Sequence, residues 1–280
     1  MLWKTAVGGA TLYAIEDGYS MRDPHEFFLG STPDAWIGHE DELHDGRIRT
    51  SFGCFLVDDG DRLTMVDAGF GVNAPDDVPH GEGGWMPAAL ESLGVDPADV
   101  TDVVFTHLHP DHILGALDAD RSSPFFPNAA FRTLRRELDH WRSDDGPLGS
   151  TIAPVVDTLD DAGTLAVVEE PGTVLPGISM VETFGHTPGH TSILVAFGED
   201  AVMISGDVLH SPMQIVHTDW NIPFDVDKPK AAASRKRLFE DLAASGTPLA
   251  GGHLDRPGFG RIVSRDDVLA FQPLAPTIID

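Results

Sequence analysis

Residues 107–112 read His-Leu-His-Pro-Asp-His, and this stretch decides both the expected fold and the expected chemistry. It follows residues 102–106, a short β-branched run that predicts a strand. Imidazole nitrogens and carboxylate oxygens are ligands that suit zinc and its first-row neighbours. The two histidines nearest the strand can point the same way, while the last two polar residues emerge further around the turn. One short loop is therefore expected to serve two adjacent metal ions, through His107, His109, Asp111 and His112.

Four side chains cannot complete two metal sites, so further ligands are expected at other strand ends. Three later segments place a histidine or aspartate beside glycine just after a predicted strand: 185–190 (Gly-His-Thr-Pro-Gly-His), 205–207 (Ser-Gly-Asp) and 251–253 (Gly-Gly-His). Glycine allows the backbone to approach a crowded centre. Spacing alone leaves both His186 and His190 open as the ligand of the first segment.

Taken in order, these motifs resemble those of the metallo-β-lactamase superfamily. The resemblance runs from residue 67 to residue 253 and includes Asp67-Ala-Gly69, which is similar to the family's aspartate motif before the metal loop. It implies an α/β fold, a four-layer αββα sandwich with the active site at one edge. It also implies a ligand set: His107, His109 and His190 for the first metal ion, Asp111, His112 and His253 for the second, and Asp207 bridging both.

Two further assignments follow from the resemblance. The family pattern is taken to place the ligand at the second histidine of His-Thr-Pro-Gly-His, so His190 is expected to bind metal and His186 to be a loop residue or a neighbour of the ligands. Asp67 is expected to orient a ligand through a hydrogen bond and not to bind metal itself.

The predicted strands fall into two groups, each followed by helices. This grouping predicts two sheets packed face to face with helices outside, in one domain covering residues 1–280. The hydrophobic residues in 17–50 and 208–227 follow neither a helical nor a strand period, and these segments are expected to form substrate loops. The strands are expected at 11–15, 52–57, 62–66, 102–106, 165–169, 178–184, 192–197, 201–205, 249–251 and 261–263, and the helices at 87–93, 131–141 and 228–244.

Composition limits the possible partners. A net charge of −27 argues against nucleic acid and anionic membrane surfaces, because both would be repelled. No apolar run reaches the roughly 18–20 residues that cross a bilayer, and no apolar stretch follows the first residues as in a secretory signal. The single cysteine, Cys54, is expected to be buried and inert. These features predict a cytoplasmic protein that acts on a small molecule, with a homodimer as one possible assembly.

Two adjacent divalent ions would hold a bridging hydroxide that attacks the substrate, since metal binding lowers the pKa of water toward 7. Zinc is the expected ion, with Mn²⁺, Co²⁺ or Fe²⁺ as alternatives. Asp111 is expected to accept or return a proton, and Asp207 to hold both ions. No nucleophile elbow, P-loop or dinucleotide motif offers another chemistry.

The last quarter of the chain resembles the branch that contains N-acyl homoserine lactonases and methyl parathion hydrolase, through segments 206–210, 223–227, 231–235 and 252–260. The resemblance implies a lactone, ester or organophosphate ester as substrate. Many lactonases of this branch have a tyrosine three residues after the bridging aspartate, whereas this chain has His210. This histidine is expected either to donate a hydrogen bond in catalysis or only to line the site.

Two other functions compete with this interpretation. Thioester hydrolysis like that of glyoxalase II would require a basic patch for its substrate, and basic residues are few. A non-catalytic metal-binding protein would usually have a closed, cysteine-rich site. Aromatic and apolar side chains in or near the unpatterned loops are candidates for the pocket wall: Phe27, Phe28, Trp36, Trp85, Met86, Met213, Ile215 and Trp220.

Overall fold

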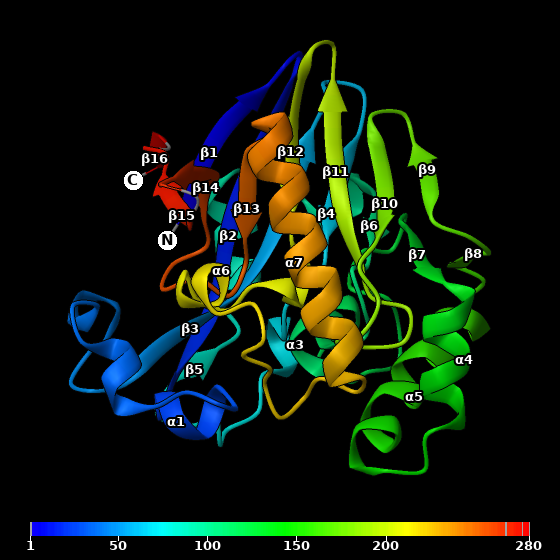
Figure 1. The fold of residues 1–280 in the computed structure, drawn as a ribbon. Coiled ribbons are helices and arrows are strands. Elements are labelled where there is room, and N and C mark those ends of the chain that lie inside the picture. Colours follow the sequence, from blue (N-terminus) through cyan, green and yellow to red (C-terminus); the bar gives the residue numbers. More distant parts are fainter. Residues whose placement is uncertain (1, 267, 276, 280) are drawn as a thin grey trace.

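The computed structural model describes residues 2–266, 268–275 and 277–279, which form two β-sheets that face each other (Figure 1). The first sheet contains β1 (Leu2–Val7), β2 (Ala10–Arg22), β3 (Ile48–Asp58), β4 (Leu63–Val66), β5 (Glu82–Gly83), β6 (Val100–Val104), β7 (Ala130–Leu134), β8 (Leu165–Val168) and β16 (Thr277–Ile279). The second contains β9 (Gly172–Leu175), β10 (Ile178–Glu182), β11 (Thr191–Phe197), β12 (Asp200–Ile204), β13 (Leu249–Gly251), β14 (Gly258–Arg265) and β15 (Val268–Pro273).

Each sheet has a mixed topology. The first has the order β16-β1-β2-β3-β4-β6-β7-β8, with β5 paired to β2, and the second has the order β15-β14-β13-β12-β11-β10-β9. Most neighbours are antiparallel, but β4, β6, β7 and β8 run parallel, as do β12 and β13. Strand β6 of the first sheet and strand β12 of the second each lead into a loop that carries polar side chains.

The helices are short, apart from two. They are α1 (Pro24–Phe27), α2 (Met86–Ser92), α3 (Pro110–Ile113), α4 (Arg135–Ser143), α5 (Pro147–Asp161), α6 (Met213–Val216) and α7 (Lys228–Ser245), with single 3₁₀ turns at Pro33–Trp36, Glu40–Glu42, Gly71–Asn73, Pro97–Asp99, Leu114–Ala116 and Gly206–Val208. No helix in the described part of the chain is long and apolar enough to cross a membrane.

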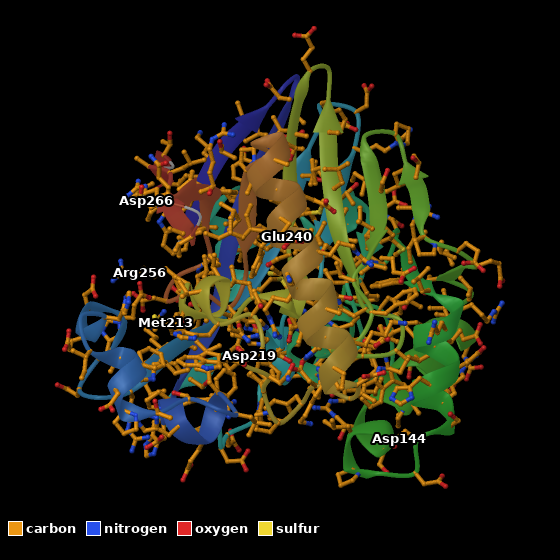
Figure 2. The ribbon with its side chains drawn as sticks, in the orientation of Figure 1. Asp144, Met213, Asp219, Glu240, Arg256 and Asp266 are labelled. Carbon is orange, nitrogen blue, oxygen red and sulfur yellow. The ribbon has the colours of Figure 1, made fainter. Side chains whose placement is uncertain are left out.

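Three hydrophobic clusters hold the layers together. One lies between the sheets and includes Phe55 from the first and Ile193 from the second. Another packs α2, α4 and α5 on the outer face of the first sheet, and a third packs α7 on the outer face of the second. On α7, Leu238 is buried against the sheet while Glu240 is exposed on the other side (Figure 2). This arrangement confirms the predicted four-layer αββα sandwich.

Two local expectations were wrong. Residues 131–141 do not form one helix, because 130–134 is the strand β7, paired in parallel with β6 and β8, and the helix begins at Arg135. The buried Phe131 and Thr133 alternate with less buried neighbours, which is the two-residue period of a strand. The 15-residue helix α5 was not predicted, and Pro154 interrupts its pattern.

The two expected loops are more ordered than their sequences indicate. β2 extends to Arg22 and β3 begins at Ile48, so both ends of the 17–50 segment are strand. The segment between them packs against 208–227 in an aromatic cluster, where Phe28 stacks on Trp36 and on Trp220. Burial of aromatic area here stabilises both segments, whose helical parts are only single turns.

Candidate metal centre

Loops from both sheets bring the predicted polar side chains to one edge of the sandwich. The 107–112 loop follows β6, the 185–190 loop joins β10 to β11, Asp207 follows β12, and His253 follows β13. All of these side chains are buried except Asp111, which is half-buried. Segments nearly 150 residues apart in sequence therefore share one cluster.

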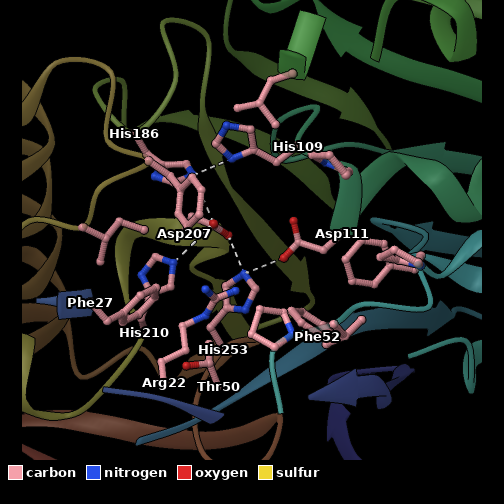
Figure 3. A pocket seen from close by; sticks show the side chains of 18 of the residues that line it. Arg22, Phe27, Thr50, Phe52, His109, Asp111, His186, Asp207, His210 and His253 are labelled. Atoms are coloured by element: carbon pink, nitrogen blue, oxygen red, sulfur yellow. Dashed lines mark hydrogen bonds and ion pairs between the residues drawn. The ribbon is translucent and has the colours of Figure 1, made fainter. Parts of the chain in front are cut away.

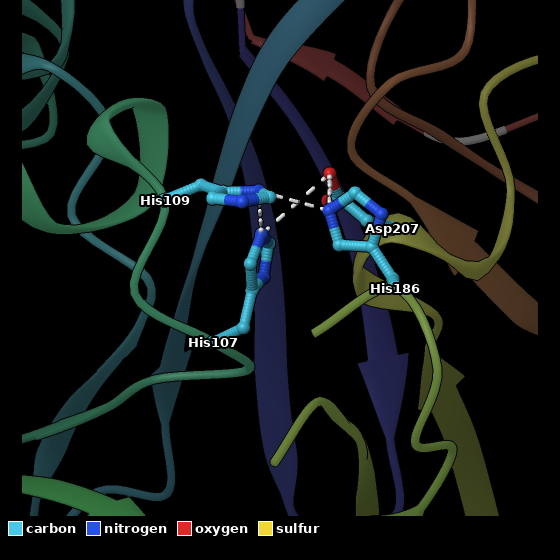
Figure 4. A group of neighbouring side chains, drawn as sticks. All are labelled: His107, His109, His186 and Asp207. Carbon is cyan, nitrogen blue, oxygen red and sulfur yellow. Dashed lines mark hydrogen bonds and ion pairs between the residues drawn. The ribbon is translucent and has the colours of Figure 1, made fainter. Parts of the chain in front are cut away.

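The first group of donor atoms consists of nitrogens of three histidines and one carboxylate oxygen of Asp207 (Figure 4). His107 Nε2 lies 3.0 Å from His109 Nδ1, and His186 Nε2 lies 2.9 Å from the same His109 nitrogen. Asp207 Oδ2 is 3.1 Å from His186 Nε2 and 3.6 Å from His107 Nε2. Three imidazole nitrogens and one carboxylate oxygen thus converge within the spacing of a single ion's ligands.

The second group uses the other oxygen of the same carboxylate. Asp207 Oδ1 lies 2.9 Å from His253 Nε2 and 3.1 Å from His112 Nε2, which are 3.2 Å from each other. Asp111 Oδ2 is 3.7 Å from both of these nitrogens. Asp207 is therefore positioned between two donor groups, as a bridging ligand must be.

Three of the rings are fixed by hydrogen bonds on the side facing away from the cluster. Ionised carboxylates and carbonyl oxygens only accept, so in each case Nδ1 donates outward and Nε2 is turned toward the cluster. Burial alone would lower the pKa of these three rings, but the nearby carboxylates, Asp207 first among them, raise it. A divalent cation between the rings would take the place of the protons on Nε2. The donor set therefore fits divalent metal ions. The three pairs are His112 Nδ1 with Asp67 Oδ2 at 2.8 Å, His253 Nδ1 with Ser51 O at 2.6 Å, and His186 Nδ1 with Asp225 Oδ1 at 2.8 Å.

Asp67 also organises the strand end before the metal loop. It has a left-handed backbone (φ 59°), an uncommon conformation for a residue with a side chain. Its carboxylate accepts hydrogen bonds from the backbone N–H and the hydroxyl of Thr106, both at 2.8 Å. Because the Thr106 hydroxyl donates to Asp67, its oxygen accepts from His107 Nδ1 at 3.1 Å. The backbone strain is thus offset by contacts that orient His107 and His112.

The structure places His186, and not the expected His190, in the first group of donor atoms, and which of the two binds metal stays a prediction. His190 Nε2 accepts a hydrogen bond from the backbone N–H of Asp207 at 2.9 Å, and its Nδ1 lies 2.9 Å from Thr183 Oγ1. Burial lowers the pKa of His190 to about 3, so the ring stays neutral and keeps the lone pair that this bond uses. His190 orients the Asp207 backbone, while His186 contributes to the first donor group.

Space around this contact is tight. Gly206 has a left-handed backbone (φ 55°), and a Cβ atom there would lie 2.6 Å from His190 Nε2. Only glycine allows both the turn and the close approach of the ring.

Asp225 was not predicted as part of the site. It lies in the 208–227 segment, and its carboxylate holds His186 through Oδ1 and accepts the backbone N–H of Ile222 through Oδ2 at 3.0 Å. The buried Arg235 lies 3.7 Å from Oδ2. A carboxylate behind a histidine ligand raises the basicity of the ring. The sequence contained only a weak indication of this role: Asp225 lies within 223–227, one of the segments that resemble the lactonase and methyl parathion hydrolase branch.

Glu137 on α4 ties the two histidine loops together and was also not predicted. Its Oε1 accepts from the backbone N–H of Leu108 at 3.1 Å and from Trp141 Nε1 at 2.6 Å. Its Oε2 accepts from Thr187 Oγ1 at 2.6 Å and from the backbone N–H of Gly189 at 2.9 Å. One buried carboxylate thus satisfies four donors and sets the distance between the two loops.

Electrostatics favour an ionised Asp207. Burial alone would raise the pKa of this carboxyl, but the surrounding histidines, His253 first among them, hold it well below its usual range. Burial lowers the pKa of His107 and of His109 well below the usual histidine value, which keeps these rings neutral. Neutral imidazole and ionised carboxylate are the forms that bind metal ions.

A cavity of about 240 Å³ opens directly onto the cluster (Figure 3). His109, Asp111, His186, Asp207 and His253 form its floor. Its walls are mostly apolar and come from several segments: Phe27, Thr50, Phe52, Phe70, Pro75, Val78, Pro79, Leu148, Ile222 and Phe224, with Arg22 and Asp77 as charged members. A mostly apolar wall above a few polar groups is typical of a small-molecule site.

Of the eight residues expected in the wall, Phe27 alone lines this cavity. Phe28, Trp36, Met213 and Trp220 instead form the aromatic cluster between the two loop segments. The others pack elsewhere: Met86 beneath the first sheet, Ile215 beneath α7, and Trp85 against Tyr19.

His210 lies where its two proposed roles require it. It lines the cavity, its Nε2 is 3.3 Å from Asp207 Oδ2, and its ring stacks on that of His253 with a centroid distance of 4.8 Å. Its buried Nδ1 has no hydrogen-bond partner within the described part of the chain. Burial lowers the pKa of His210 to about 4, so the ring is neutral near pH 7.

Comparison with known proteins agrees with this architecture. Residues 54–274 match the family described as the Metallo-beta-lactamase superfamily. An N-acyl homoserine lactonase of a Bacillus species is 27% identical over 153 residues, 54% of each chain. The N-acyl homoserine lactonase AttM of Azorhizobium caulinodans is 32% identical over 174 residues, 50% of this chain and 58% of that one. The chain thus matches little more than half the length of these relatives.

Two solved structures are similar over nearly the whole chain. AidC, a dizinc quorum-quenching lactonase solved with a product, has a TM-score of 0.88 at 24% identity, covering 98% of this chain and 97% of that one. The hydrolase AbOPH has a TM-score of 0.86 at 25% identity, with the same coverage. These likenesses show a shared fold.

Proposed function

Because this chain belongs to the metallo-β-lactamase superfamily, we propose that it is a binuclear metal-dependent hydrolase of a lactone, ester or organophosphate ester. The observation that carries the proposal is the pair of donor groups around the two oxygens of Asp207, at the floor of an apolar cavity. A cluster that served only structure would not need an opening of this kind.

We assign the ligands by donor atom. The first ion would be held by one oxygen of Asp207 and three imidazoles, and the second by the other oxygen, two imidazoles and one further carboxylate. Zinc suits this set, and Mn²⁺, Co²⁺ or Fe²⁺ are alternatives. The proposed ligands are His107, His109 and His186 for the first ion, Asp111, His112 and His253 for the second, and Asp207 for both.

Bound divalent ions would supply Lewis acidity, which lowers the pKa of water toward 7 and polarises a carbonyl or phosphoryl oxygen. Residues of the chain would transfer protons, contact the substrate and exclude water. Asp111 is the half-buried carboxylate at the cavity floor and can take a proton from the attacking water and return it to the leaving group. His210, which lines the cavity beside Asp207, would contact the polar end of the substrate. The apolar wall would exclude bulk water from the reacting bond.

The substrate class rests on relatives. The matched curated proteins include N-acyl homoserine lactonases, and the similar structures include AidC and AbOPH. A lactone or ester therefore stands first and an organophosphate ester second. Thioester hydrolysis has no specific support in the cavity, where Arg22 is the one basic residue other than histidine among the lining residues described.

A hydrolysis panel tests the proposal. Protein of measured metal content would be offered lactones, aryl esters, thioesters, β-lactams and phosphotriesters, with a pH indicator that reports acid release from every class. We expect turnover of lactones or esters that is lost on chelation and restored by zinc, cobalt or manganese. Turnover that survives complete metal removal would contradict the proposal.

A further inference from the structure

Arg22 is a cation at an unusual place in this molecule. The chain has 18 basic and 45 acidic residues, yet Arg22 lies at the end of β2 on the wall of the cavity above the cluster. Its side chain is partly buried and extends toward the polar floor (Figure 3). Partial burial lowers the pKa of Arg22 somewhat, while the charge of Asp111 favours the protonated form. The guanidinium remains charged at any physiological pH.

Several other partly or fully buried arginines in the described chain are paired with carboxylates. Arg49 lies 2.6 Å from Glu16, and Arg132 lies 2.7 Å from Asp102. Arg22 forms no ion pair with any carboxylate of the described residues, and its Nε donates to Ser20 Oγ at 3.1 Å. Its two terminal nitrogens therefore keep donors available to a ligand.

Two aromatic rings hold the guanidinium in place. Its central carbon lies 5.3 Å from the ring centroid of Phe27 and 5.9 Å from that of Phe224. Both distances allow cation–π attraction, which fixes the position without consuming the hydrogen-bond donors. The same three residues also line a second cavity on the outer side, so they separate the site from the surface.

We propose that Arg22 determines specificity by binding an oxygen acceptor, a carbonyl or a carboxylate, on the part of the substrate that does not react. The preferred substrates would then carry such a group beside an apolar substituent that contacts the wall. This inference rests on the proposed hydrolase function. The planar guanidinium holds its terminal N–H donors in a fixed fork. A substrate oxygen acceptor can therefore bind to it with well-defined geometry.

Three γ-butyrolactones of similar size test the inference, with an alkyl, an acylamino or a carboxyalkyl substituent beside the ring. They would be offered to wild type, Arg22→Met, Arg22→Lys and the control Arg47→Met. Arg47 is exposed and lines the outer cavity but not the inner one, so its loss changes the net charge equally. Binding of the matching γ-lactams, which resist hydrolysis, would be measured by calorimetry on the same proteins.

Arg22→Met should lower kcat/KM and lactam affinity by about 10–100-fold for substituents that carry an acceptor, the loss expected for a charge-assisted hydrogen bond. The alkyl compound should change by less than about threefold, and Arg47→Met should leave all three unchanged. A larger effect on the carboxylate than on the amide, with partial rescue by lysine, would identify an anion as the preferred group. The reverse order would identify a carbonyl.

Equal losses for all three compounds, or no loss for any, would overturn the role of Arg22. If wild type hydrolyses none of the lactones, the lactone part of the proposed function fails, and the lactam affinities still decide the role of Arg22. Wild type that binds all three lactams equally would contradict it.

Discussion

The floor and the wall of the cavity are built on different principles. At the floor, each proposed histidine ligand except His109 has its outer nitrogen held by an oxygen. For His107 this oxygen belongs to the adjacent Thr106, and for the others it comes from a distant segment, as in the pairs His112–Asp67 and His186–Asp225. The wall consists mostly of apolar side chains contributed by loops and strand ends, such as Phe224. Directional bonds set positions to within fractions of an ångström, whereas apolar packing tolerates exchange of side chains of similar volume.

The reaction therefore depends on the floor, and the choice of substrate depends on the wall. The floor can keep one reaction while the wall changes to suit different substrates. Variants of the floor should therefore abolish turnover for every substrate, and variants of the wall should change which substrate is preferred.

The largest effect is expected for Asp207→Ala, which removes a carboxylate shared by both donor groups. Turnover should fall by more than about 10³-fold on every substrate, because removal of even one stabilising group from such a site costs about 10²–10³-fold. Metal content, measured by inductively coupled plasma mass spectrometry, should fall as well. Full activity in this variant would refute the bridging role.

The next effect separates the two histidines of the 185–190 loop. His186→Ala should lose the first ion and most of the turnover. His190→Ala should keep more of both, losing about 10–100-fold, the usual cost of a group that acts through a ligand. Metal analysis and kcat of the two variants, compared at the same zinc concentration, decide between them. A more severe loss for His190→Ala would restore His190 as the ligand.

Glu137→Gln should have an intermediate effect. The amide keeps the volume but replaces one acceptor oxygen by an NH₂ group, which faces two donors and cannot accept from them. Zinc affinity should fall by about 10–100-fold, as measured by competition with a chromophoric chelator. Asp139→Asn on the same helix is the matched control, since that side chain is exposed. Equal affinities for the two variants would show that Glu137 does not set the loop spacing.

Asp17, which supports the wall, is expected to affect turnover least and to act mainly on the stability of the fold. Its buried carboxylate accepts from the backbone N–H groups of Phe70 and Met86, both at 2.7 Å. Burial raises the pKa of Asp17 from 3.8 to about 6 in the folded chain. The folded state then holds this proton more tightly than the unfolded state, so the contribution of Asp17 to the free energy of unfolding falls between about pH 4 and pH 6.

Comparing wild type with Asp17→Asn isolates the contribution of Asp17 ionisation to the free energy of unfolding, because the amide cannot ionise. For the chelated proteins, the difference in free energy of unfolding by urea should change by about 3 kcal/mol between pH 4 and pH 6.5, at 1.36 kcal/mol per pKa unit. Wild type should lose stability relative to the variant as the pH rises. A difference independent of pH would mean that Asp17 titrates normally.

Most of the donor cluster could be predicted from sequence because its residues stand in short motifs at strand ends. Six of the seven expected ligands lie in the cluster, and the loop after each strand places them there. His186 and His190 could not be separated by spacing, since both follow β10 within a few residues. The decision depends on the hydrogen bond from the Asp207 backbone, which joins segments 17 residues apart.

The supporting carboxylates and the wall were harder to predict. Glu137 lies on a helix whose pattern is that of ordinary packing. Three of its four donors come from loops elsewhere in the chain, and the fourth is Trp141 on the same helix. The sequence does not distinguish the aromatic residues that face the cavity from those that do not: Phe27 lines the cavity, whereas the adjacent Phe28 packs in the aromatic cluster. Long-range packing, and not local pattern, decides such positions.

Metal stoichiometry of the purified, zinc-loaded protein shows whether each chain binds two ions. Six side chains arranged around the carboxylate of Asp207 predict two ions per chain for wild type and a loss of zinc in Asp207→Ala. A wild-type sample that holds at most one ion per chain at saturating zinc would contradict the binuclear centre.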